Sequence, residues 1–139
     1  MKSRLIVVGL FLAVAMGIVM TSVSAAQAAC TLIVIQGRSG VTPPSASLNA
    51  GDCVVFMNFT GSASSMTEEV KVLYKAGESC LKASYAAVGF DLDQNKCLTT
   101  GWLKYGQTAT VGFTQSGTYN FDVYFKEGGP SINGTITVK

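Results

Sequence analysis

The sequence contains no histidine. This absence excludes a Ser-His or Cys-His catalytic pair, an imidazole general base, and any zinc, copper or haem site that depends on histidine. Charged residues are also scarce, at 13% of the chain. Ser, Thr, Lys and Asp are present, but none falls in a recognisable arrangement of nucleophile and base. The sequence therefore favours a protein that is not an enzyme.

The first 28 residues have the pattern of a secretory signal peptide. Lys2 and Arg4 form a basic start, and Leu5–Met20 is an uncharged apolar run. Ala26-Gln27-Ala28 then supplies a small-x-small cleavage site. Removing 28 of the 139 residues leaves 111, which is enough for one domain over residues 29–139. We therefore expect an exported protein, periplasmic or extracellular.

The chain after this leader has no net charge. The leader holds two of the ten Lys and Arg residues, and the remaining eight equal the eight Asp and Glu residues. A basic surface for nucleic acid or for anionic lipid has no charge excess behind it. No later apolar run approaches the ~18 residues of a membrane-spanning helix. We expect no nucleic-acid partner and no membrane span.

Four cysteines follow the leader, at Cys30, Cys53, Cys80 and Cys97. An even number in an exported chain predicts two disulfides, for which three pairings exist. We favour Cys30 with Cys53, which begin two expected strands, and Cys80 with Cys97, which bracket one excursion of the chain. A metal site would need thiolates closer together in the sequence, as in C-x-x-C.

Cys30 also stands close enough to the cleavage site to be a lipid attachment point. The residues before it, Gln27-Ala28-Ala29, lack the aliphatic side chain usual three positions before a lipidated cysteine. Lipidation would also leave an odd number of thiols. We therefore favour soluble export over a lipid anchor at Cys30.

Short segments rich in β-branched and aromatic residues recur along the rest of the chain, separated by turn-forming residues. Most alternate between apolar and polar positions, which is typical of strands with one buried face. This pattern predicts an all-β protein, either a two-sheet β-sandwich or an open barrel, with mainly antiparallel pairing. The expected strands and extended segments are Thr31–Gln36, Val41–Ser47, Cys53–Phe59, Glu68–Tyr74, Gln107–Thr114, Tyr119–Lys126 and Gly134–Lys139.

The segment Cys53–Phe59 is apolar on both faces. Val54 and Phe56 point one way, and Val55 and Met57 point the other. A strand of this kind is expected to be covered on both sides or to lie near a closed end. The same argument makes Met57 a core residue rather than a metal ligand.

Lys75–Leu103 is the least regular stretch. Within it, Leu81, Tyr85 and Val88 recur at helical spacing, and Gly89 is a suitable C-terminal stop. We therefore expect a short helical or irregular insertion. A connection of 29 residues is long for so small a domain, which suggests a dedicated role.

Three segments in order resemble the cupredoxins, the blue-copper family that includes plastocyanins and phytocyanins. They are Leu48–Asn58 (LNAGDCVVFMN), Phe113–Phe121 (FTQSGTYNF) and Asn133–Val138 (NGTITV). The resemblance extends over nearly the whole chain after the leader. It implies a Greek-key sandwich of two sheets with the metal site at one end.

The resemblance does not extend to the copper ligands. Blue copper needs two imidazoles and a thiolate, with a weak axial thioether. At the first imidazole the chain offers Ser64–Glu68, and at the thiolate it offers Val123. The second imidazole would fall near Lys126, and the thioether near Ser131 or Ile132. We therefore expect a cupredoxin-like domain without type-1 copper or another cofactor.

A few residues remain candidates for a site. Met66 and Glu68 are the best candidates for a soft or mixed metal site, although one exposed Met is usually no ligand. Trp102 and Tyr105 lie near the same expected end, where with Met66 they could line a ligand or partner loop; the alternative is that Trp102 packs against the sandwich. Asp91 and Asp93 resemble the start of a calcium loop, but a solvated acidic turn fits them better.

These observations favour an exported, non-enzymatic binding or structural module, whose partner is an unidentified protein or small ligand. Variable loops on a rigid sandwich are where such a function usually lies. One alternative is a Cu(I) or other metal-handling protein that uses Met and carboxylate ligands. The other is a self-assembling surface or filament subunit that associates through strand edges.

Overall fold

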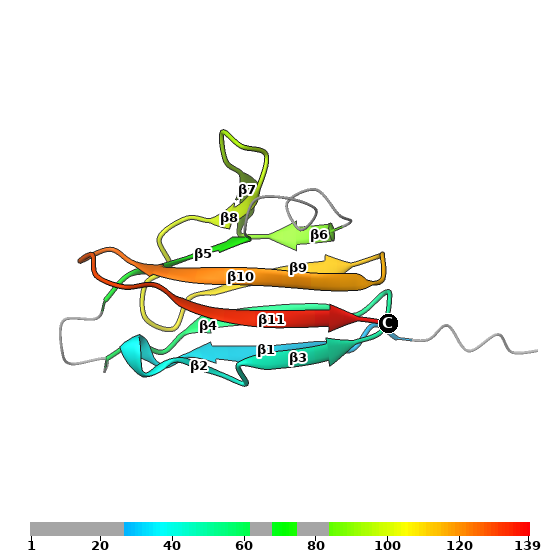
Figure 1. The fold of residues 1–139 in the computed structure, drawn as a ribbon, viewed down its shortest axis with the longest axis horizontal. Helices are drawn as coiled ribbons and strands as arrows, with labels where there is room; N and C mark the ends of the chain where they lie inside the picture. Colours follow the sequence, from blue (N-terminus) through cyan, green and yellow to red (C-terminus); the bar gives the residue numbers. More distant parts are fainter. Residues whose placement is uncertain (1–26, 62–67, 75–83) are drawn as a thin grey trace, which may run out of the picture.

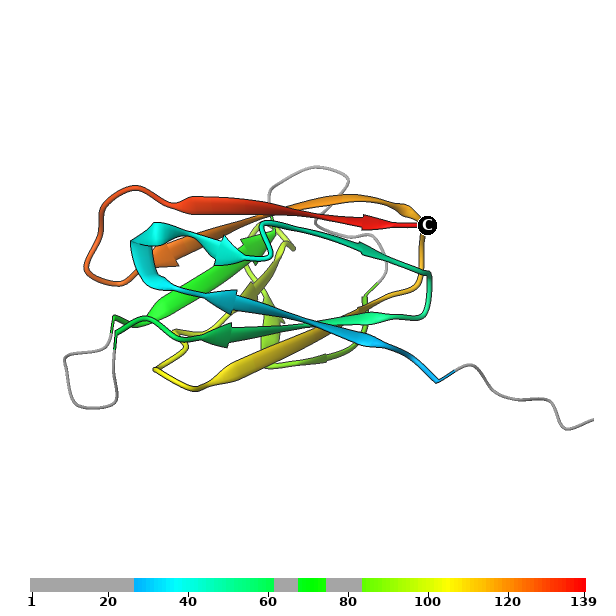
Figure 2. The same ribbon diagram turned by 90° about the horizontal axis from the view of Figure 1, so that it is seen from below.

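Two β-sheets packed face to face form the domain, and the C-terminus lies at one end of the sandwich (Figures 1 and 2). The computed structural model describes residues 27–61, 68–74 and 84–139. Sheet A contains, in spatial order, β2 (Val41–Thr42), β1 (Cys30–Ile35), β4 (Cys53–Asn58), β9 (Thr108–Phe113) and β6 (Ser84–Val88). Sheet B contains β3 (Ser45–Leu48), β11 (Ile132–Val138), β10 (Gly117–Phe125), β5 (Val70–Tyr74), β8 (Leu98–Thr100) and β7 (Phe90–Leu92).

The chain passes repeatedly between the two sheets. It runs from β1 and β2 in sheet A to β3 in sheet B, back to β4 in sheet A, and on to β5 in sheet B. β1 pairs with β4 and β3 pairs with β11 in parallel, while the other strand pairs are antiparallel. The prediction of an all-β, two-sheet sandwich is therefore confirmed.

Alternating residues of the two sheets meet in an apolar core. Along β10, Tyr119, Phe121 and Val123 are each at most 1% exposed, as the alternation in the sequence predicts. The ring of Phe121 meets that of Phe56 from sheet A edge to face, with centroids 5.0 Å apart. Edge-to-face pairs of this kind stabilise a core beyond the area they bury.

Over residues 84–103, the part of the expected helical or irregular insertion that the structure describes, the chain is mostly strand. Tyr85 and Val88 lie in β6, which pairs with β9, and β7 and β8 form a hairpin that extends sheet B. The spacing between Tyr85 and Val88 fits either a helix or an irregular strand. Here the backbone of β6 pairs with β9, and this pairing makes the segment a strand. Leu81 lies outside the described residues. No helix among the described residues is long and apolar enough to cross a membrane.

The first predicted disulfide is present. Cys30 and Cys53 are bonded, with 4.4 Å between their Cα atoms. They are also register partners at the start of the parallel pair β1 and β4, which explains why their side chains meet. The pairing of Cys97 with Cys80 stays a prediction, because Cys80 lies outside the described residues.

β4 is covered unequally on its two faces, so the expectation of full cover on both sides is wrong at Val55 and Met57. Val54 and Phe56, on its inner face, are fully buried. Val55 and Met57, on its outer face, are only partly buried. Met57 therefore belongs to the outer surface of sheet A and not to the core between the sheets.

Candidate functional site

Several connections gather at the end of the sandwich away from the C-terminus (Figures 1 and 2). They are the 3-10 turn η1 (Gly37–Ser39), the turn between β10 and β11, and the segments next to the end of β4 and the start of β5. We refer to this part of the molecule as the η1 end. It is where the resemblance to cupredoxins places a metal site.

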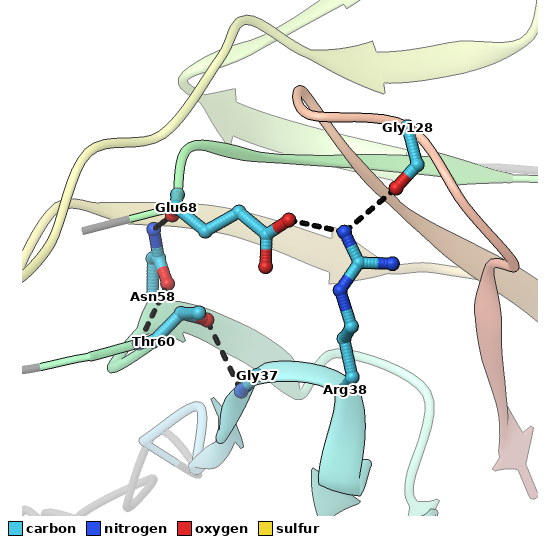
Figure 3. Close-up of polar contacts among 6 residues, drawn as sticks. All are labelled: Gly37, Arg38, Asn58, Thr60, Glu68 and Gly128. Atoms are coloured by element: carbon cyan, nitrogen blue, oxygen red, sulfur yellow. Dashed lines mark hydrogen bonds and ion pairs between the residues drawn. The ribbon is translucent and has the colours of Figure 1, made fainter. Parts of the chain in front are cut away.

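Arg38 joins three of these segments (Figure 3). Its guanidinium forms an ion pair with the carboxylate of Glu68, before β5. The same nitrogen, Nη2, donates a hydrogen bond of 2.7 Å to the carbonyl oxygen of Gly128, in the β10–β11 turn. The guanidinium carbon lies 4.7 Å from the ring centroid of Phe125, at the end of β10. One side chain from η1 thus connects both sheets.

Asn58 organises the buried side of the same cluster. This residue at the end of β4 is fully buried, and its Nδ2 donates to the carbonyl oxygens of Glu68 at 2.9 Å and Leu103 at 2.8 Å. Its Oδ1 accepts from the backbone N–H of Thr60 at 2.9 Å. Thr60 Oγ1 in turn accepts from the N–H of Gly37 at 3.1 Å.

These contacts close a ring. Starting from Gly37, the hydrogen bonds run through Thr60 and Asn58 to Glu68, whose carboxylate returns to Arg38, the neighbour of Gly37 (Figure 3). A network in which every member has a partner fixes the positions of the loops that it joins. The described segments of the η1 end are therefore tied to one another by this network.

The residues at the positions expected for copper ligands make other contacts. Val123 is fully buried in the core, and the partly buried Ile132 packs against this core. Lys126 Nζ forms an ion pair with Glu69 Oε2 at 2.9 Å, and Ser131 is exposed. Within the described residues, no group of three or more Cys, Asp or Glu side chains could hold a metal ion.

The two metal candidates from the sequence have separate outcomes. Glu68 lies at the η1 end, as expected, and its carboxylate is paired with Arg38. Met66 lies outside the described residues, so its role as a ligand stays a prediction. Arg38 and Asn58 were not singled out as site residues by the sequence. The available signals were that Arg38 is the only arginine after the leader and that Asn58 ends an apolar strand.

The candidate partner residues Trp102 and Tyr105 take part in two separate aromatic contacts. The ammonium of Lys71 lies 4.7 Å from the Trp102 ring centroid, and 38% of Trp102 is exposed. Tyr105 packs on Phe59 with ring centroids 5.0 Å apart, and Phe59 is 48% exposed. Leu103, between them in sequence, is buried and pairs with Val70. Trp102 therefore lies against Lys71 on the outer side of sheet B and does not enter the core between the sheets.

Asp93 forms the turn between β7 and β8. Asp93 Oδ1 accepts hydrogen bonds from the N–H groups of Asn95 and Cys97, both at 2.8 Å. A side chain that satisfies its own backbone in this way is typical of an Asx turn. The interpretation as an acidic turn is confirmed for Asp93, whereas Asp91 lies in strand β7 and pairs with Thr99.

The groups with shifted pKa values lie apart from the cluster around Arg38. Burial raises the pKa of Tyr74, in the core, well above its usual value. At the turn before β4, hydrogen bonds from the backbone N–H groups of Asn49 and Ala29 lower the pKa of Asp52. Both shifts follow from local structure: desolvation disfavours a phenolate, and N–H donors favour a carboxylate.

No protein-family model and no curated protein matches the sequence. Solved structures do match in fold. A reduced variant of amicyanin and a Cu(I) form of another amicyanin variant each superpose with a TM-score of 0.54 at 19% identity. An oxidised amicyanin variant superposes with a TM-score of 0.53 at 20% identity. In each case the alignment covers 84% of this chain and 87% of the other. Together with the two-sheet topology, these neighbours show that the chain has a cupredoxin-like fold.

Proposed function

We propose that the chain is an exported, cupredoxin-like binding module that works without type-1 copper and without catalysis. Type-1 copper requires two imidazoles and a thiolate. The chain has no histidine, and the position that corresponds to the thiolate is Val123, a buried hydrocarbon side chain. The donors that are present do not fit this metal site.

The contacts of Arg38 carry the proposal. The resemblance to cupredoxins expects copper ligands in the segment before β5 and in the region around the β10–β11 turn. Arg38 contacts Glu68 in the first and Gly128 in the second, and its guanidinium lies over the ring of Phe125. A guanidinium carries a positive charge. Like charges a few ångströms apart repel by several kcal/mol at an effective dielectric constant of about 20. A fixed guanidinium therefore disfavours a copper ion between the same segments.

The surface for a partner is expected around the aromatic side chains of the connections. Phe59 and Trp102 expose large parts of their rings, and Tyr105 supports Phe59. Partly exposed aromatic residues on loops of a rigid sandwich are frequent anchors for proteins and small ligands. The partner is accordingly a protein or small molecule with an apolar group to place there.

Export is supported by the disulfide between Cys30 and Cys53, because such bonds persist in oxidising compartments. The same bond argues against a lipid anchor, since a sulfur held in a disulfide is not free to form the thioether of a lipidated cysteine. The protein is accordingly proposed to be soluble in the periplasm or outside the cell. The segment 1–28 is proposed as the signal that directs it there.

Metal analysis of the exported protein tests the proposal. The purified protein is loaded with Cu(II) and separately with Cu(I), passed over a chelating column and analysed by native mass spectrometry and visible absorption. Amicyanin treated in the same way is the positive control. We expect no retained copper and no blue band. Retention of one copper per chain would overturn the proposal.

A further inference from the structure

Ala29, the residue after the expected cleavage site, is bonded to the domain through both of its backbone groups. Its N–H donates to Asp52 Oδ1 at 3.0 Å, and its carbonyl oxygen accepts from the N–H of Cys53 at 2.9 Å. The next residue, Cys30, is bonded to Cys53 and is its register partner in β1 and β4. The Ala29 nitrogen is therefore held in place by contacts with residues that all follow it in the sequence.

The carboxylate of Asp52 is placed by the turn between β3 and β4. Its second oxygen, Oδ2, accepts from the N–H of Asn49 at 2.8 Å, and the N–H of Asp52 donates to the carbonyl oxygen of Asn49 at 3.0 Å. N–H donors stabilise the charged form of a carboxyl group, which agrees with the lowered pKa of Asp52. Lys139 is bonded to the same turn, because the N–H of Ala50 donates to its carbonyl oxygen at 3.0 Å. The Ala29 nitrogen thus faces a carboxylate that is negatively charged at neutral pH.

Cleavage after Ala28 changes the chemistry of this nitrogen and leaves its contacts within the domain intact. Hydrolysis adds the hydroxyl of a water molecule to the carbonyl carbon of Ala28 and the remaining hydrogen to the nitrogen of Ala29. The uncharged amide N–H becomes an amine that is largely protonated at neutral pH. We propose that this new ammonium group forms an ion pair with Asp52, so that removal of the leader creates the contact that fixes the start of the mature chain.

The same geometry favours this cleavage position over the next one. A cut between Ala29 and Cys30, which lipidation of Cys30 would require, would remove the nitrogen that faces Asp52 and the oxygen that accepts from Cys53. The inference rests on the export signal of the proposed function, since an unprocessed chain has no amine at this position. The contact lies at the end of the sandwich that holds the C-terminus, away from the η1 end, so it does not depend on the absence of copper (Figures 1 and 2).

Intact mass and N-terminal sequencing of the exported protein test the cleavage position. The full chain is expressed with its own leader, purified from the exported fraction and analysed without reduction. We expect one species that begins at Ala29. A chain that keeps residues 1–28 would contradict the export signal as well as this inference. An exported chain that begins at another residue, Cys30 included, would overturn this inference and leave export standing.

The rate at which the Ala29 amine is acetylated tests the ion pair. Only the uncharged amine reacts, and a neighbouring carboxylate favours the charged form. At neutral pH we expect the amine of the wild type to react at least about threefold more slowly than that of Asp52→Asn. Asp122→Asn, on the outer face of sheet B, is the matched control and is expected to react at the wild-type rate. Equal rates for the folded wild type and Asp52→Asn would overturn the proposal.

Two further measurements separate the ion pair from a change in folding. Raising the salt concentration to about 1 M screens an exposed pair without any substitution, and it is expected to bring the wild-type rate toward that of Asp52→Asn. In urea with the disulfides reduced, Ala29 and Asp52 are 23 residues apart in an unfolded chain, and both proteins are expected to react at the same rate. A wild-type rate that salt does not change, or a difference that persists in the unfolded chains, would count against the pair.

Discussion

The guanidinium of Arg38 lies 4.7 Å from the ring centroid of Phe125, with its Nη2 atom bonded to Glu68 and to the carbonyl oxygen of Gly128. A single cation therefore joins η1, the segment before β5 and the β10–β11 turn. In a metal-binding domain of this shape a bound ion can link loops in the same way. Here the link is covalently part of the chain, and its contribution can be measured by substitution.

Arg38→Met is expected to lower the free energy of unfolding by about 1–2 kcal/mol. The loss combines a cation–π contact, a hydrogen bond to a carbonyl and an ion pair that solvent weakens, since 44% of the Arg38 side chain is exposed. Urea denaturation measures the change. Lys126→Met is the control, because it removes only the ion pair with Glu69 from a side chain that is 49% exposed. If both variants lose the same stability, Arg38 has no special role at the η1 end.

Asn58→Ala is expected to cost more, about 3 kcal/mol or above. It leaves the carbonyl oxygens of Glu68 and Leu103 and the N–H of Thr60 without their side-chain partner in a buried site. Asn120→Ala is the matched control, because the Asn120 amide makes an exposed bond to Thr135. The expected loss for the control is below about 1 kcal/mol. Equal losses in the two variants would contradict the role given to Asn58.

The sequence predicted the strands well where one face is buried. Along β10, Tyr119, Phe121 and Val123 all enter the core because side-chain direction in a strand alternates with every residue. The spacing of Tyr85 and Val88 was ambiguous, and pairing with β9 decided their structure. Local pattern is therefore reliable where burial is one-sided and weak where an edge strand depends on a distant partner.

Local sequence patterns of this kind did not predict the cluster around Arg38. Arg38 and Gly128 are 90 residues apart, and Arg38 and Glu68 are 30 apart. Contacts of this range are set by the topology of the sandwich and have no periodic trace in the sequence. The motifs that resemble cupredoxins predicted where the loops would meet. They did not predict which side chain would join them.

Gly134→Ala is expected to destabilise the fold by about 2–4 kcal/mol. A Cβ at this position in β11 would lie 2.3 Å from a ring carbon of Phe121 and 2.9 Å from the carbonyl oxygen of Pro44. Phe121 is fully buried and cannot move aside without disturbing the core. Gly101→Ala is the control, because an added Cβ there meets no atom within 4 Å. Thermal unfolding should give a lower melting temperature for Gly134→Ala than for Gly101→Ala. A Gly134→Ala protein as stable as the wild type would show that the core can rearrange around the added methyl group.

The disulfide between Cys30 and Cys53 is expected to contribute about 3 kcal/mol, because it closes a loop of 23 residues in the unfolded chain. The double variant Cys30→Ser with Cys53→Ser tests this by urea denaturation without leaving a free thiol at either site. Peptide mapping of the unreduced wild type checks the pairing at the same time. It is expected to give one peptide pair for Cys30 with Cys53 and another for Cys80 with Cys97. Any exchange of partners between the pairs would contradict the predicted second bond.

Asp52 is expected to make stability depend on pH in the acidic range. The N–H groups of Asn49 and Ala29 donate to its carboxylate and lower its pKa below the usual value of an aspartate. A carboxyl group whose pKa is lower in the folded state binds protons more readily when unfolded. Its contribution is therefore complete above the unfolded pKa and is lost as the pH falls through the folded pKa.

Asp52→Asn removes this titration and keeps the shape of the side chain. The difference in unfolding free energy between wild type and Asp52→Asn is expected to shrink as the pH falls from neutrality to below the folded pKa of Asp52. Asp122→Asn, on the outer face of sheet B, provides the comparison for a general change in charge. Chemical denaturation at a series of pH values measures both. A difference for Asp52→Asn that stays constant over this range would mean that the backbone donors do not favour the charged carboxylate.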